Sequence, residues 1–337
     1  MAGRVARAVA ARCGARNARG PAAEDPALAS PVTSPSIALV GCGRWGRHIL
    51  RDLVALGCDV TVVDVDEAAR ENACANGARK AVRHFDEVRA ADGVIISTPA
   101  ATHARLASEA LERGAAVFCE KPFVLSVAEA DMLAEKGRGR LFVMDKWRYH
   151  QGIEALRALG RTSAAGEIVS LETTRIGQSP DQVDVDPVWT LAPHDLAIAL
   201  EILGEIPEPV AASAEVREGR AVGLTATLGA RPLAVIEVHG ASPVTRREIR
   251  LTCEGLVATL PGAMSDHLLI ADGEDRNSGG DSVETRLAIG TEAPLMRELR
   301  AFLGHLAGGP PPKSSADDAA RVTRVLSNLR AMAGLDP

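Results

Sequence analysis

Short apolar runs alternate with helix-patterned segments along the first half of the chain. The helix-patterned segments are Arg47–Leu56, Glu67–Ala75 with Asp66 as its N-cap, His103–Arg113, and a stretch from Ser126 to about Gly137. The strand-like runs between them are Ile37–Val40, Val60–Val63, Gly93–Ser97, Ala115–Cys119 and Leu141–Met144. Because parallel strands need a crossover connection, usually a helix, this alternation predicts a parallel sheet covered by helices.

The second half has a different pattern, in which strands follow one another with few helices between them. The expected strands are Glu167–Thr174, Val210–Val216, Ala221–Leu228, Leu233–His239 and Arg247–Cys253. The expected helices are Gln151–Leu159, His194–Leu203 closed by Gly204, Pro294–Leu306, and one near Ala316–Met332. Closely spaced strands of this kind predict a mostly antiparallel sheet.

Together the two patterns predict an α/β chain with an N-terminal Rossmann domain and a C-terminal α+β domain. We place the Rossmann domain at residues 36–150 and the substrate-binding and oligomerisation domain at residues 151–337. The last helix has two possible places, within the second domain or packed back on the Rossmann domain. Residues 1–35 are rich in Arg, Ala and Pro, with no acid before Glu24, and are predicted to be a disordered tail; an organelle transit peptide is the alternative.

Composition narrows the functional class. The 337 residues are 46% hydrophobic and 24% charged, as in ordinary soluble enzymes, and the net charge of -6 argues against nucleic acid or an anionic membrane as the main partner. No apolar run is long enough to span a bilayer. The six cysteines are scattered, without a C-x-x-C pair or a histidine at zinc spacing, which predicts free thiols in a reducing, cytoplasmic compartment and no metal site.

A glycine motif joins the first strand to the first helix. Its sequence is Gly41-Cys42-Gly43-Arg44-Trp45-Gly46. Glycines allow a sharp turn and close approach of the backbone to a ligand, and the helix start offers free N–H groups to a phosphate. Asp64 closes the second strand, where a carboxylate would accept hydrogen bonds from an adenosine ribose and repel a 2′-phosphate, and no basic residue follows before Arg70. The motif therefore predicts NAD(H) as the cofactor, in preference to NADP(H).

Two polar turns follow the next strands, at the edge of a parallel sheet where ligands bind. Ser97-Thr98-Pro99 would meet the cofactor ribose or nicotinamide, with His103 near the following helix start. In Glu120-Lys121-Pro122, the lysine would donate a hydrogen bond to a substrate oxygen on which charge develops. Each turn has a plain alternative, an ordinary strand-ending turn for the first and a solvated surface turn for the second.

Pro193-His194-Asp195 opens the predicted helix of the second domain. Proline suits the first helical turn, so His194 is expected at the helix start, where the dipole disfavours a protonated imidazole and favours a proton acceptor. The alternative is a histidine that caps or packs the helix.

The combination of these motifs resembles the Gfo/Idh/MocA family, the glucose–fructose oxidoreductase and inositol dehydrogenase group. The shared features are, in order, Gly41–Gly46, Asp64, Ser97-Thr-Pro with His103, Glu120-Lys121-Pro122, Gly166-Glu-Ile168 and Pro193-His194-Asp195. The resemblance implies a Rossmann domain, an open-faced antiparallel sheet, an active site between them, and hydride transfer between the nicotinamide and a secondary alcohol or ketone of a sugar, nucleotide sugar or cyclitol. It also implies a homo-oligomer, a dimer or tetramer.

The same resemblance assigns roles to individual positions. Lys121 takes the position of the family's Glu-Lys-Pro lysine and His194 that of its catalytic histidine, and Trp-x-Leu-Ala-Pro-His-Asp is similar to the branch that acts on nucleotide-linked and other modified sugars. Arg148, Tyr149 and Arg175 fall where such enzymes contact substrate, although each also fits a structural ion pair or a packing role.

One position departs from the family pattern. Many members carry Asp four residues before the histidine, and here Thr190 stands there, with Asp184, Asp186 and Asp195 as possible substitutes. A hydroxyl can orient an imidazole but does not stabilise its charged form as a carboxylate would. The departure leaves open a modified proton relay, Lys121 as the main acid/base group, or a weakened enzyme. It motivates one rival function, a cofactor-binding regulatory protein. A reductase of a non-sugar C=O or C=N group is a further, separate alternative.

Overall fold

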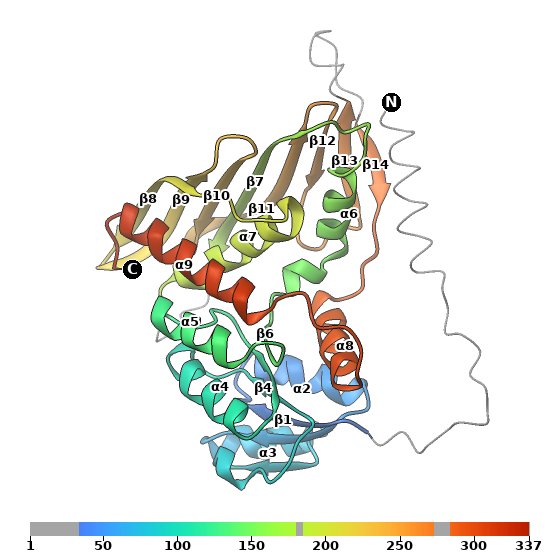
Figure 1. The fold of residues 1–337 in the computed structure, drawn as a ribbon, viewed down its shortest axis with the longest axis vertical. Coiled ribbons are helices and arrows are strands. Elements are labelled where there is room, and N and C mark those ends of the chain that lie inside the picture. The colour runs from blue at the N-terminus through green and yellow to red at the C-terminus, as the bar shows by residue number, and fades with distance from the viewer. Residues whose placement is uncertain (1–33, 180–184, 273–283, 337) are drawn as a thin grey trace, which may run out of the picture. The chain divides into compact units, whose positions relative to one another are not determined.

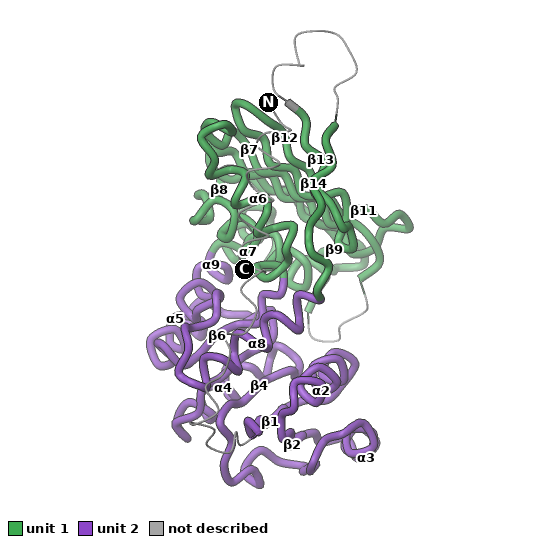
Figure 2. Tube along the Cα trace, turned by 90° about the vertical axis from the view of Figure 1, so that its right-hand side faces the viewer, with its two compact units in different colours: residues 1–30, 147–292, 325–337 green, residues 31–146, 293–324 purple. Residues whose placement is uncertain are grey.

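The computed structural model describes residues 34–179, 185–272 and 284–336, so the sequence expectations for the N-terminal tail and for Asp184 lie outside the described residues. The described chain forms two compact units that interleave along the sequence (Figure 2). The Rossmann unit contains the chain up to Lys146 together with residues 293–324, and the sheet unit contains residues 147–292 and the chain from Val325 onward. Over the described residues, no helix has both the length and the hydropathy of a membrane span.

The Rossmann unit is built on a parallel sheet, as the sequence predicts, with six strands where five were expected. Its order is β3-β2-β1-β4-β5-β6; β1, β4 and β6 are labelled in Figure 1. The strands are β1 (Ser36–Val40), β2 (Asp59–Val63), β3 (Lys80–Val82), β4 (Gly93–Ile96), β5 (Ala116–Cys119) and β6 (Leu141–Val143). β3 was not expected, because a three-residue edge strand gives no periodic signal in the sequence.

Helices pack on both faces of this sheet. They are α2 (Gly46–Ala55), α3 (Glu67–Ala75), α4 (His103–Glu112), α5 (Val127–Lys136), α8 (Pro294–Leu306) and the first part of α9 (Ala316–Met332). One apolar core joins α4, α5 and the start of α9 to one sheet face, and another joins α2 and α8 to the opposite face. In the second core the Phe302 ring of α8 stacks on Phe118 of β5 at 4.9 Å. Asp66 caps α3 as predicted, accepting from the Ala68 N–H at 3.2 Å.

The order of this sheet fixes where a ligand can bind. β1 lies between β2 and β4, so the crossovers on its two sides run in opposite directions. The carboxyl ends of parallel strands at such a point form the ligand crevice of open α/β sheets. The turn after β1 and the turn after β4 therefore carry the positions that matter most, Gly41 and Ser97.

The sheet unit contains an eight-stranded sheet in the order β14-β13-β12-β11-β7-β10-β9-β8. The strands are β7 (Ile168–Gln178), β8 (Pro209–Arg217), β9 (Arg220–Leu228), β10 (Leu233–His239), β11 (Ala241–Cys253), β12 (Leu256–Leu260), β13 (His267–Asp272) and β14 (Thr285–Ala288). Neighbours are antiparallel except β7 and β10, which are parallel. The sequence did not predict β12 to β14 or the first half of β11.

One face of this sheet is covered by α6 (Gln151–Leu159) and α7 (Pro187–Leu203). Leu156 and Ile198 from these helices pack with Leu171 and Leu251 of the sheet in one buried cluster. Along β10, buried residues alternate with half-buried ones. Since successive side chains point to opposite faces of a strand, the second face of the sheet is the more open one.

The start of α7 corrects a sequence expectation. The helix begins at Pro187, with Asp186 as its N-cap accepting from the Trp189 N–H at 3.1 Å, and Pro193 lies inside it. Asp followed by Pro is itself a strong helix start, which the sequence interpretation overlooked in favour of the second proline. His194 is therefore in the helix interior, and the expectation that the N-terminal dipole tunes it is wrong, since that effect fades within the first turn.

Candidate active site

The glycine turn after β1 has the geometry that a bound dinucleotide needs. Gly41 has φ of +90°, and a Cβ there would lie 2.6 Å from the Ser97 carbonyl oxygen, so no other residue fits. A Cβ on Gly46 would lie 2.4 Å from the Gly41 carbonyl oxygen, so this glycine lets α2 start close to the strand. Nothing lies within 4 Å of a Cβ built on Gly43, which is exposed. The turn thus leaves open space over Gly43 and the exposed Arg44, at the N-terminus of α2.

Asp64 is tied to this turn. One carboxylate oxygen accepts from the Cys42 N–H at 2.7 Å and the other from the Asp66 N–H at 3.0 Å. The side chain is half-buried, and a carboxylate has further lone pairs for a ribose diol. The Arg70 guanidinium donates to the Asp64 carbonyl oxygen at 2.8 Å, which holds a cation at this end of the site.

The turn after β4 is held by His103. This imidazole is 1% exposed, with Nε2 2.9 Å from the Thr98 carbonyl oxygen and Nδ1 3.0 Å from the carbonyl oxygens of Pro122 and Phe123. His103 thereby links the Ser97–Pro99 turn to the Glu120–Pro122 turn. The Ser97 hydroxyl is buried and has no hydrogen-bond partner among the described residues. An orphaned hydroxyl beside Gly41 and Gly46 fits a cofactor that would supply the missing partner.

Glu120 is the centre of a second group of contacts. Trp45 Nε1 donates a hydrogen bond to one carboxylate oxygen, and the Lys121 N–H donates to the other at 2.9 Å. The Lys146 ammonium lies 4.1 Å from the centre of the Trp45 ring, a cation–π contact. Burial raises the pKa of Glu120, and the positive charges of Lys121 and Lys146 oppose that shift. Trp45 and Glu120 therefore connect the glycine turn to the turn that carries Lys121.

A buried acid from α8, which sequence analysis did not single out, belongs to the same region. Glu298 is 1% exposed, and neither of its carboxyl oxygens has a hydrogen-bond partner in the described chain. Burial and then the negative charges of Glu120 and Asp145 raise the pKa of Glu298 well above its usual range. It is remote in sequence from the other members of the group, so no motif could have identified it.

In the sheet unit, His194 is a buried residue of α7. His194 is 7% exposed, and its ring lies 6.5 Å from that of Trp147 in an edge-on arrangement. Thr190, one helical turn earlier, donates a hydrogen bond to the Asp186 carbonyl oxygen at 3.1 Å. Asp186 itself caps α7 and pairs with Arg330 at 2.9 Å.

Two of the predicted substrate residues form buried ion pairs. Arg175 donates two hydrogen bonds to Asp195, at 2.7 and 3.1 Å, and its guanidinium lies 4.5 Å from the centre of the Trp147 ring. Arg148 donates to Glu201 at 3.0 Å. Tyr149, which follows Arg148 in the chain, is 5% exposed. Trp147 and Asp195 are thus functional candidates that sequence analysis missed or set aside; their adjacency to Arg148 and His194 was the available signal.

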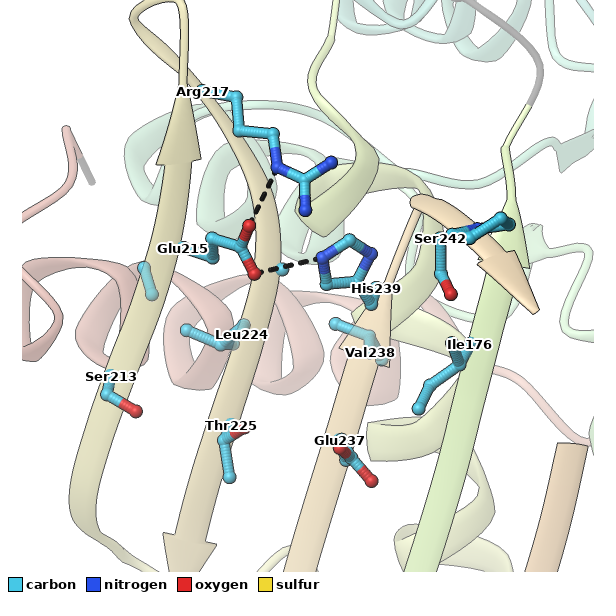
Figure 3. Close-up of a pocket in the computed structure, with 13 residues that line it drawn as sticks. Ile176, Ser213, Glu215, Arg217, Leu224, Thr225, Glu237, Val238, His239 and Ser242 are labelled. Carbon is cyan, nitrogen blue, oxygen red and sulfur yellow. Dashed lines mark hydrogen bonds and ion pairs between the residues drawn. The ribbon is translucent and has the colours of Figure 1, made fainter. Parts of the chain in front are cut away.

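A separate cavity of about 390 Å³ lies on the open face of the sheet (Figure 3). Glu215 lines this cavity, accepting from Arg217 at 2.7 Å and facing His239 Nε2 at 3.1 Å. His239 is the β-sheet partner of Ile176, whereas Arg175 points to the opposite face. This cavity is therefore distinct from the surroundings of His194. Within the described residues, no group of three or more His, Cys, Asp or Glu side chains could hold a metal ion.

Comparison with known proteins supports the geometry of the Rossmann unit. Residues 36–141 match the family model GFO_IDH_MocA, described as an oxidoreductase family with an NAD-binding Rossmann fold. The match covers β1 to the start of β6 and includes the glycine turn, Asp64, the Ser97 turn and Lys121.

Two curated relatives match a longer stretch. The chain is 31% identical over 196 residues to UDP-N-acetylglucosamine 3-dehydrogenase of Acidithiobacillus ferrooxidans, covering 56% of this chain and 58% of the relative. It is 30% identical over 200 residues to inositol 2-dehydrogenase of Rhizobium meliloti, covering 55% and 60%. The matched segments therefore span less than two thirds of either relative.

Two solved dehydrogenase structures share the fold of this chain. The structure of the Acidithiobacillus ferrooxidans UDP-N-acetylglucosamine 3-dehydrogenase superposes with a TM-score of 0.77 at 24% identity, covering 89% of this chain and 98% of that one. Levoglucosan dehydrogenase in complex with NADH superposes with a TM-score of 0.77 at 15% identity, covering 90% and 97%. The predicted pairing of a Rossmann domain with a mostly antiparallel sheet domain is confirmed.

Proposed function

We propose that this protein is an NAD(H)-dependent oxidoreductase that transfers hydride between the nicotinamide and a secondary alcohol or ketone of a sugar-like substrate. The observation that carries the proposal is the glycine turn, in which Gly41 with its positive φ and tightly packed Gly46 flank the open space over Gly43. The dehydrogenase names of the curated relatives support the same chemistry.

The cofactor would be held by the Rossmann unit's own groups. The N–H groups at the start of α2 would receive the pyrophosphate, and Asp64 would accept from the adenosine ribose, which favours NAD(H) over NADP(H). The buried Ser97 hydroxyl and the Thr98-Pro99 turn would contact the nicotinamide half. When bound, the cofactor supplies the hydride acceptor or donor.

The proton steps fall to Lys121 and His194. The Lys121 ammonium would donate a hydrogen bond to the substrate oxygen and stabilise the negative charge that develops on it. His194 would take up the hydroxyl proton in the oxidative direction and return it in the reductive one. With Thr190 in place of a carboxylate, the His194 imidazolium would receive less stabilisation, so the pH profile of oxidation depends on this single turn of α7.

The decisive experiment follows nicotinamide absorbance with NAD+ or NADP+ and a panel of nucleotide sugars, free sugars and inositols. We expect turnover with NAD+ and one substrate class, reduced by about 10²–10⁴-fold in Lys121→Ala and His194→Ala, the range for loss of a general acid or base. Lys136→Ala and His267→Ala are matched controls, since Lys136 pairs with Glu112 and His267 contacts Asp266, away from the proposed site. NADH binding without turnover of any substrate would refute the proposed enzymatic activity and favour the role of a cofactor-binding regulatory protein.

We also propose that the protein is a homo-oligomer that associates through the open face of the sheet. The half-buried, alternating side chains of β10 on this face support the proposal. A strictly monomeric mass by light scattering at micromolar concentration would refute it.

A further inference from the structure

Two arginines face each other across neighbouring strands beside α7. Arg175 of β7 and Arg247 of β11 are directly paired in the antiparallel register. Side chains of such a pair project from the same face of the sheet and lie close together. Because Arg175 reaches Asp195 of α7, this is the helix-covered face that also carries His194.

The charges of this group do not cancel. The buried Asp195 carboxylate is 1% exposed and accepts one hydrogen bond on each oxygen from Arg175, which is 4% exposed. Arg247 is exposed and makes no ion pair or hydrogen bond through its guanidinium within the described chain. Partial burial, and then the positive charge of Arg175, lower the pKa of Arg247, while Asp195 acts in the opposite direction.

No acidic residue of β11 forms an ion pair with Arg247. Glu248, the next residue, points to the opposite face, where Arg246 approaches it at 3.5 Å and Arg250 at 3.8 Å. Among the residues that the structure describes, one carboxylate, that of Asp195, therefore faces two guanidinium groups on the helix-covered side. The excess positive charge is placed on the accessible member of the pair.

Arg175, the strand partner of Arg247, is linked to the proposed proton acceptor through Trp147. Trp147 contacts both sides, with the Arg175 guanidinium 4.5 Å from its ring centre and the His194 ring at 6.5 Å. Asp195 follows His194 directly in α7. The buried Arg175–Asp195 pair thus joins β7, the strand that pairs with β11 at Arg247, to α7, the helix that carries His194.

We propose that Arg247, supported by the Arg175–Asp195 pair, binds an anionic group of the substrate, a carboxylate or a phosphate, and selects acidic sugar derivatives over neutral ones. The inference rests on the proposed function, since it names the substrate class of the same site. A guanidinium with free N–H groups suits either oxyanion, because its planar fork matches their paired oxygens. The two sources of the anion are a sugar acid and a nucleotide sugar.

The test measures binding to the NADH-loaded protein by titration calorimetry, with three probes. Glucuronate supplies a carboxylate, UDP-N-acetylglucosamine a diphosphate, and N-acetylglucosamine neither. For at least one anionic probe we expect Arg247→Ala to weaken binding by about 10- to 100-fold, the effect of losing a hydrogen bond to a charged group, and Arg247→Lys to weaken it less. Neutral N-acetylglucosamine should bind both variants as it binds the parent.

Arg246→Ala is the matched control, because it removes a neighbouring exposed arginine from the opposite face. It should bind all three probes as the parent does. The anion that loses affinity identifies its source, a carboxylate for a sugar acid or a diphosphate for a nucleotide sugar. The inference is overturned if neither anionic probe binds, if Arg247→Ala binds the anionic probes as the parent does, or if it loses the neutral probe equally. Arg247-dependent binding without turnover would leave the inference standing and refute the proposed function instead.

Discussion

Glu298 places a carboxyl group where neither solvent nor a hydrogen-bond donor of the described chain reaches it. An ionised carboxylate in such a place is costly, so burial and the nearby negative charges of Glu120 and Asp145 keep this group protonated over a wide pH range. An acid whose pKa is higher in the folded than in the unfolded state binds its proton more tightly when folded. Its contribution to stability is complete below the unfolded pKa of about 4.3 and is lost as pH rises toward the folded pKa.

The neutral isostere Glu298→Gln should remove this pH-dependent loss. At neutral pH we expect the free energy of unfolding to increase by about 0.5–2 kcal/mol, the usual range of single stabilising changes, and the gain to vanish below about pH 4. Denaturant unfolding at several pH values measures both effects. Glu71→Gln, an exposed change on α3, is the control and should alter neither. A Glu298→Gln protein that is less stable than the parent, increasingly so at high pH, would show that the fold uses the carboxylate.

Single side chains also show how far sequence patterns reach toward the site. Gly41, Asp64, Ser97 and Glu120 could be placed from the sequence because each directly follows a strand, and strand ends meet at one edge of a parallel sheet. The pairing of Arg175 with Asp195 could not, because it depends on how α7 lies over β7. Local periodicity shows which face of an element is buried but does not show what that face meets.

The turn between β1 and α2 separates binding from folding at the scale of an element. Gly43→Ala adds a methyl group that meets nothing within 4 Å, and Gly43 does not have a positive φ. We therefore expect stability to fall by no more than about 1 kcal/mol, while NADH affinity falls by about tenfold or more because the methyl group fills space needed by the pyrophosphate. Nicotinamide fluorescence and thermal unfolding measure the two quantities.

Gly262→Ala is a matched control, since a Cβ there also meets nothing within 4 Å. It should leave NADH affinity unchanged. Undiminished NADH binding in Gly43→Ala would mean that the pyrophosphate does not pass over this turn.

α7 shows the limit of sequence patterns for a whole element. Its end at Leu203 before Gly204 was predicted, because glycine with φ of +89° is a standard helix stop. Its start was not, since Pro187 and Pro193 both fit a first turn and only the hydrogen bond from the Trp189 N–H to Asp186 decides between them. The outcome moves His194 from a helix terminus into a buried helix interior, where neighbouring side chains rather than the helix dipole govern its chemistry.

At the scale of the whole molecule, sequence order and structural unit diverge. α8 was predicted with its bounds correct, because its apolar positions recur at helical spacing. That spacing predicts that one face of the helix packs against a core. It does not indicate which of the two sheets supplies that core. In the structure Leu299 and Phe302 complete the Rossmann core, so residues 293–324 join the unit from which they are most distant in the chain.

This division predicts where NADH should protect the backbone from hydrogen exchange. A ligand at 100 times its Kd stabilises the unit that binds it by about 2.7 kcal/mol, which slows amides that exchange through unfolding of that unit by about 100-fold. We expect this slowing in α2 and equally in α8, more than 200 residues later in the sequence, whereas β12 and β13, nearer to α8 in the chain, should change little. Exchange followed by mass spectrometry of the full-length protein resolves these segments, and the Gly43→Ala protein under the same NADH concentration should show little protection. Equal slowing in all segments would mean that both units unfold as one, and an unchanged α8 would mean that it does not belong to the unit that binds the cofactor.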